Sequence, residues 1–128
     1  MILYTISFAF QQAILEAVMV SVSTSSPSLL LQRFKNAIDN KHVVTWKYYA
    51  DGDFTHTPPQ WADKAYMRPS IESGKLKFNI VKTASLAVTT PVYAVYHGRL
   101  IESLMEHFDQ TFTDAYGTAM PGAGDVIR

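Results

Sequence analysis

The fold is decided by the stretch YMRPSIESGKLKFNIVK, residues Tyr66–Lys82. Its centre, Ser73-Gly74, is typical of a tight turn between two antiparallel strands. After the turn, apolar residues alternate with polar ones, which indicates a strand with one buried face. These apolar residues are Leu76, Phe78 and Ile80. The stretch therefore predicts a β-hairpin. Pro69 cannot donate to a sheet ladder, so we expect its strand to be bulged or to lie at an edge.

Two amphipathic helices are predicted, one on each side of this hairpin. The first has Ser26 as its cap and Pro27 as its first residue, and it ends near Asn40. Its apolar face comprises Leu30, Leu31, Phe34, Ala37 and Ile38. The second is capped by Thr90 and begins at Pro91. Its longer apolar stripe comprises Tyr93, His97, Leu100, Ile101, Leu104, Met105, Phe108 and Phe112.

The remaining segments complete a predicted order of α-β-β-β-α. Val43–Ala50 is rich in β-branched and aromatic residues and predicts a strand. A further short strand is possible over Ser85–Thr89. The fold class is therefore α+β, with a small antiparallel sheet of three or four strands packed against two amphipathic helices. We expect three parts: an apolar extension over 1–24, a single domain over 25–117, and an irregular tail over 118–128.

The first 22 residues, MILYTISFAFQQAILEAVMVSV, carry one charge, at Glu16. They lack the positive region of a secretory signal, and polar residues interrupt any membrane span. Three interpretations stay open: an extra N-terminal element packed on the domain, sequence upstream of a start at Met19, or a weak anchor. We expect no membrane association unless residues 1–22 are an anchor. Ser21–Ser28 is rich in serine and predicts a linker.

Composition excludes several classes of function. The chain has no cysteine, so disulfides and thiolate sites are absent, and a cytoplasmic location is expected. Nucleotide-binding and common hydrolase motifs are missing, and we predict no cofactor and no metal. Total charge is zero, but residues 33–82 hold nine basic and five acidic residues. This distribution allows a basic sheet face for an anionic partner.

The stretch DGDFTHTPPQW, Asp51–Trp61, is the most suggestive loop. Asp51, Asp53 and His56 are candidates for a metal or general-base site, although Asp-Gly-Asp is also ordinary turn chemistry. His97, inside the second helix, is a further catalytic candidate, with a core position as the alternative. Arg99 and Glu102 predict a helix ion pair, or else an anion site at the start of that helix.

Aromatic and basic residues around this loop are candidates for partner binding. They are Phe54, Trp61, Lys47, Tyr49, Tyr66 and Arg68. We expect the uncovered sheet face to carry Lys47, Tyr49, Tyr66, Arg68, Lys75 and Lys77. Phe54 and Trp61 either pack the loop onto the domain or form an exposed anchor.

The α-β-β-β-α order resembles that of double-stranded-RNA-binding domains. Where those domains have a lysine cluster at the start of the last helix, this chain has only Arg99. The preferred function is a small, soluble, non-catalytic protein-binding module of the accessory or immunity type. It uses the 51–61 loop and the adjoining sheet face. The alternatives are a metal- or histidine-dependent hydrolase or nuclease, and a nucleic-acid-binding domain.

Overall fold

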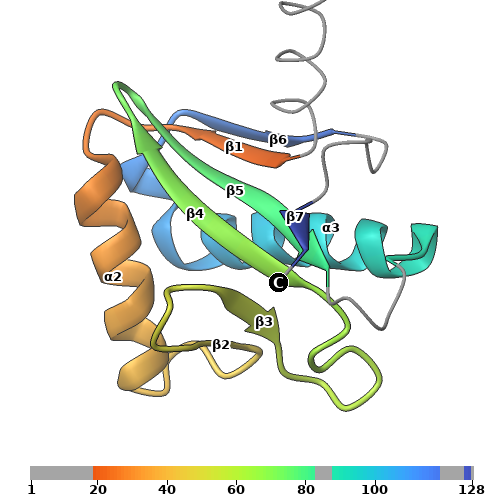
Figure 1. Ribbon diagram of the computed structural model, residues 1–128. Helices are drawn as coiled ribbons and strands as arrows, with labels where there is room; N and C mark the ends of the chain where they lie inside the picture. Colours follow the sequence, from red (N-terminus) through yellow and green to blue (C-terminus); the bar gives the residue numbers. More distant parts are fainter. Residues whose placement is uncertain (1–18, 83–87, 119–125, 128) are drawn as a thin grey trace, which may run out of the picture.

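A computed structural model of the protein describes residues 19–82, 88–118 and 126–127. Within these residues the fold is α+β, with two helices and a six-stranded antiparallel open sheet in the order β2-β3-β4-β5-β1-β6 (Figure 1). The strands are β1 Met19–Ser23, β2 Trp46–Tyr48, β3 Phe54–His56, β4 Tyr66–Glu72, β5 Lys75–Lys82 and β6 Asp114–Gly117. The helices are α2 Pro27–Asp39 and α3 Thr90–Phe108, followed by a 3-10 turn, η1 Asp109–Thr111.

The predicted hairpin is confirmed as β4 and β5, paired from Tyr66↔Val81 to Glu72↔Lys75. Gly74 adopts a φ of +76°, which a residue with a side chain rarely takes, so the turn requires glycine there. Strand β3 pairs with β4 only at Phe54↔Met67. Strand β4 lies between β3 and β5 and its register with β5 is continuous, so the prediction of an edge or bulged strand is wrong. Pro69 is tolerated because, among the described strands, it lies beyond the short pairing of β4 with β3.

The sheet has more strands than the three or four predicted. Strand β1 lies between β5 and β6, and its Val20 and Val22 are fully buried. The interpretation of Ser21–Ser28 as a linker is wrong, because pairing on both sides holds 21–23 in the sheet. The predicted strand Val43–Ala50 is shorter, as β2. Strand β3 lies inside the stretch predicted as a loop.

Two other predicted segments lie largely outside the described residues. Residues 85–87 of the possible strand Ser85–Thr89 are among these, as is most of the tail over 118–128. Within that tail, the two-residue β7, Val126–Ile127, pairs in parallel with the end of β5. Neither described helix combines the length and apolarity that a membrane span needs.

Both helices pack on one face of the sheet and share its core (Figure 1). The limits predicted for α2 are confirmed. Phe34 of this helix stacks on Phe54 of β3 with ring centroids 5.0 Å apart. It also meets Phe78 and Phe108 edge-on. This aromatic cluster ties α2, the sheet and the end of α3 together.

Helix α3 is confirmed, but it begins one residue earlier than predicted, with Thr89 in place of Thr90 as its N-cap, and its buried face is rotated relative to the predicted stripe. Leu100 and Leu104 are fully buried as expected, whereas Met105 is 50% exposed. Tyr96 and Ser103 occupy the core instead. Their hydroxyl groups bond to partners on the β2–β3 side of the sheet, which apolar periodicity does not reveal.

Leu104→Ala and Met105→Ala form a matched pair that tests this orientation. Removing the Leu104 side chain leaves a cavity in the core and should lower the free energy of unfolding by about 2–5 kcal/mol. Met105→Ala should stay within about 0.5 kcal/mol of the wild type, because the side chain is half in solvent. Urea unfolding measures both, and equal losses would contradict the observed face of α3.

Candidate functional site

The beginning of the 51–61 stretch is a tight turn joining β2 to β3. The Tyr49 N–H donates to the Asp53 carbonyl and the Gly52 N–H donates to the Tyr49 carbonyl, both at 2.9 Å. The Asp53 N–H donates to Asp51 Oδ1 at 3.0 Å. Gly52 has a φ of +93°. The turn-chemistry interpretation of Asp51-Gly52-Asp53 is confirmed.

Asp53 is completely buried and is held by Arg68 of β4. The guanidinium donates from Nε to Oδ1 at 2.9 Å and from Nη2 to Oδ2 at 3.0 Å. This hydrogen bond is the main cause of the raised pKa of Arg68, whose charged form is thereby favoured. This bidentate contact joins the start of β3 to β4, two strands that share a single pair of facing residues.

His56 leaves the sheet on the opposite side from Asp53, because side chains three apart in an extended chain point to opposite faces. Its ring packs on Trp46 with centroids 4.7 Å apart. Nδ1 lies 2.6 Å from the Thr45 carbonyl, so that nitrogen carries the proton and donates. Burial lowers the pKa of His56, and the Thr45 hydrogen bond only partly opposes this. The ring is therefore neutral at pH 7, with Nε2 as an acceptor.

His56 lines a pocket of about 230 Å³ between the end of β3, the loop after it and helix α3. The lining residues are Thr45, His56, Pro58, Gln60, Trp61, Arg99, Glu102 and Ser103. Arg99 Nη1 lies 3.2 Å from Glu102 Oε1. The predicted ion pair is confirmed, and since both side chains are more than half exposed it contributes little to stability. We call this feature the His56 pocket.

Sequence reasoning found His56 and Trp61 but missed their partners from α3. The sequence predicts Arg99 to pair with Glu102 or to form an anion site at the helix start, and it gives no role to Ser103. Ser103 Oγ accepts a hydrogen bond from the buried Trp46 indole at 3.1 Å. No local signal in the sequence links the loop to this helix, because the contacts form only after folding.

His97 lies at a different place, beside β6. Its ring centroid is 4.1 Å from that of Tyr93, and a Cβ at Gly117 would lie 3.1 Å from its Nδ1. Burial lowers the pKa of His97 to about 4, and the Thr118 backbone opposes this weakly. In the described part of the chain, neither ring nitrogen has a hydrogen-bond partner of ordinary geometry. The core position given as its alternative is confirmed by the burial of His97, whereas the hydrogen bonds expected of a core histidine are not found among the described residues.

The expected basic sheet face is partly buried. Tyr66 lies against Tyr49, and Lys77 donates to Glu72 at 3.0 Å. The expectation that Tyr66 and Lys77 face solvent is therefore wrong. The Tyr49 hydroxyl donates to Asp63 at 2.6 Å, while the ammonium of Lys47 lies 5.2 Å from the Tyr49 ring.

Phe54 is fully buried in the aromatic core, so the packing alternative holds for it and the exposed-anchor alternative is wrong. Trp61 is partly buried against the core and partly open to the His56 pocket. Of the two aromatic residues in the loop, only Trp61 is placed to meet a partner.

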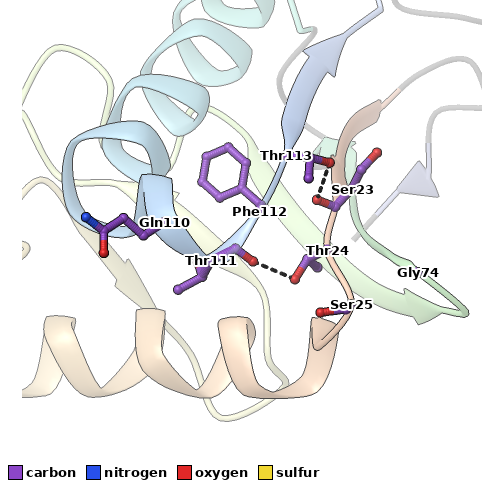
Figure 2. A pocket seen from close by; sticks show the side chains of 8 residues that line it. All are labelled: Ser23, Thr24, Ser25, Gly74, Gln110, Thr111, Phe112 and Thr113. Atoms are coloured by element: carbon purple, nitrogen blue, oxygen red, sulfur yellow. Dashed lines mark hydrogen bonds between the residues drawn. The ribbon is translucent and has the colours of Figure 1, made fainter.

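A second, larger pocket of about 420 Å³ lies where the β1–α2 connection, the hairpin turn and the end of α3 meet (Figure 2). None of its eight lining residues is charged. Figure 2 shows that Thr24 donates to the Thr111 carbonyl, and Thr113 to the Ser23 carbonyl. These hydroxyl groups serve the fold, so the His56 pocket is the better candidate for function.

Within residues 19–82, 88–118 and 126–127, no group of three histidine or carboxylate side chains is arranged to hold a metal ion. Comparison with protein-family models, with curated proteins and with solved structures finds no match to this chain.

His97 should make the protein acid-sensitive. Its pKa falls from 6.5 in the unfolded chain to about 4 in the folded protein, so the unfolded state binds more protons between these values. The stabilisation is fully present above pH 6.5 and is lost as the pH falls to about 4. The total loss should be about 3 kcal/mol. Unfolding at several pH values measures it, and an NMR titration of the His97 ring with a midpoint near 6.5 would contradict it.

The Asp53–Arg68 pair should be structural. Arg68→Met leaves a buried carboxylate without its cation and should cost about 3 kcal/mol of folding free energy. Lys75→Met removes an exposed charge from the neighbouring strand and should change stability by less than about 0.5 kcal/mol. Thermal and urea unfolding compare the two. Similar effects would mean that the pair is not a stabilising contact.

Proposed function

We propose that the chain is a non-catalytic protein-binding module, and that the His56 pocket is its binding site. The observation that carries this is the meeting of Trp61 with Arg99 and Glu102 at one partly open pocket. Tryptophan and arginine are the residues most often found at the energetic centre of protein interfaces. The loop that supplies Trp61 follows β3, which the Phe34–Phe54 stack and the Asp53–Arg68 pair hold in the sheet, so we expect binding to require little ordering.

The hydrolase or nuclease alternative has weaker support. Its four candidates occupy different surroundings: Asp51 is in a turn, Asp53 is bound to Arg68, His56 faces the pocket, and His97 is beside β6. General acid–base chemistry needs such groups within hydrogen-bonding reach of one substrate atom. Of the four, only His56 lines the pocket.

The nucleic-acid alternative loses part of its basic face. Arg68 is bound to Asp53 and Lys77 to Glu72, so neither charge is available to neutralise phosphates at its full strength. Lys47 and Lys75 remain exposed, and two cations give a weak, salt-sensitive attraction.

The cytoplasm stays the proposed compartment, because a cysteine-free chain fits a reducing environment.

Photo-crosslinking tests the binding function. A benzophenone amino acid replaces Gln60, which lines the His56 pocket, or Gln110, which lines the second pocket and is the matched control. In cells of the native host, the probe at Gln60 should form a discrete adduct with another protein, and the probe at Gln110 should not. Trp61→Ala should weaken the adduct about tenfold or more, as expected for a residue at the centre of an interface.

Three results would contradict the proposal. They are no adduct from position 60, equal adducts from both positions, or an adduct that contains nucleic acid. Circular dichroism of the Trp61→Ala protein serves as the control that the fold persists.

A further inference from the structure

We infer that the His56 pocket accepts the side-chain carboxamide of a glutamine or asparagine on the protein partner. This inference rests on the proposed function and specifies what the partner must present. It follows from three properties of the pocket: its size, its set of donors and acceptors, and its balance of charge.

The size favours a single side chain. A volume of about 230 Å³ is below the range of pockets that enclose drug-sized molecules, yet it is large enough for one long side chain. Pro58 and Trp61 line it and offer apolar surface to the methylene groups of such a side chain. The polar residues are then left to contact the group at its end.

The pocket presents both acceptors and donors. His56 lines the pocket, and because its Nδ1 carries the proton and donates to Thr45, its acceptor atom is Nε2. Glu102 offers carboxylate oxygens. Arg99 contacts Glu102 through Nη1 alone, at 3.2 and 3.3 Å, so its Nε and Nη2 protons are not used in that pair. A ligand that both donates and accepts would satisfy the two kinds of group at once.

The charge balance excludes ionised ligands in favour of a neutral one. With His56 neutral, the charges of Arg99 and Glu102 cancel. A ligand carboxylate would be attracted by Arg99 but repelled by Glu102. A ligand ammonium would be attracted by Glu102 but repelled by Arg99. A carboxamide donates through its NH₂ group and accepts through its oxygen, so it can bind both without displacing either charge.

The test uses four probes that share the same two backbone amides and differ only in the side chain. They are the N-acetyl methylamides of glutamine, glutamate, lysine and alanine. Binding to the full-length protein at pH 7 is followed by the NMR shift of the Trp61 indole N–H. The glutamine probe should bind about tenfold or more tightly than each of the others, because their mismatched or missing end group leaves pocket groups unpaired.

Two substitutions should switch the preference. Glu102→Gln leaves Arg99 as the sole charge, so the glutamate probe should become the tightest by about tenfold. Arg99→Gln leaves Glu102 and should favour the lysine probe in the same way. Both side chains are more than half exposed, so the fold should persist. Glu106→Gln, on the exposed surface of α3, is the matched control and should keep the glutamine preference.

Three other results with the probes would decide against the carboxamide inference. If the alanine probe binds as well as the glutamine probe, the pocket binds the backbone amides and not the side-chain carboxamide. If the glutamate or lysine probe is preferred in the wild type, or no probe shifts the Trp61 signal, the carboxamide assignment is overturned. A protein adduct at Gln60 would in each case leave the binding function standing. Absence of that adduct together with a glutamine preference would instead overturn the protein-binding proposal and keep the pocket's selectivity.

Discussion

The position of α3 against the β2–β3 hairpin is the constraint on which the His56 pocket depends. Three polar contacts set it: the Trp46 indole donates to Ser103 Oγ at 3.1 Å, and the Tyr96 hydroxyl bonds both to Thr55 and to the Trp61 carbonyl. Burial raises the pKa of Tyr96, which keeps its hydroxyl protonated and able to donate. Leaving such buried groups unpaired costs about 1–3 kcal/mol each, so the helix and the loop have one strongly preferred arrangement. That arrangement brings Arg99 and Glu102 to Trp61.

The hairpin itself is held to the sheet by side chains more than by its strand ladder. Strands β3 and β4 share one pair of facing residues, Phe54↔Met67. The stack of Phe34 on Phe54 fixes one face of β3, and the buried Asp53–Arg68 pair fixes the other. Side chains on both faces therefore replace backbone pairing as the source of rigidity, and the 56–61 loop begins from a fixed point.

Local signals in the sequence were sufficient for the two helices and the β4–β5 hairpin. Proline at each helix start, and the turn at Gly74, act through neighbouring residues alone. Strand β1 agrees with the extra N-terminal element that the sequence left open, but its place between β5 and β6 was not predicted. Strand β6 was not predicted at all, because it is short and pairs with residues about a hundred positions away. Strand β3 escaped prediction because its polar residues look like a loop. Asp53 and Thr55 are fully buried, each satisfied by a partner on another element.

The same contrast, between local sequence signals and contacts formed only in the tertiary fold, separates the predicted features of the site from the others. The tautomer of His56 is set by the Thr45 carbonyl within the β2–β3 hairpin, so it is a property of nearby sequence. Its neutral state comes chiefly from burial, which the tertiary fold supplies. The sequence of the loop thus predicted two of the pocket residues, His56 and Trp61. The charge balance that selects the class of ligand arises only when α3 adds Arg99 and Glu102. Because Asp53 is turned to the opposite face and bound to Arg68, the loop's most conspicuous carboxylate serves the scaffold, and Glu102 provides the carboxylate of the pocket.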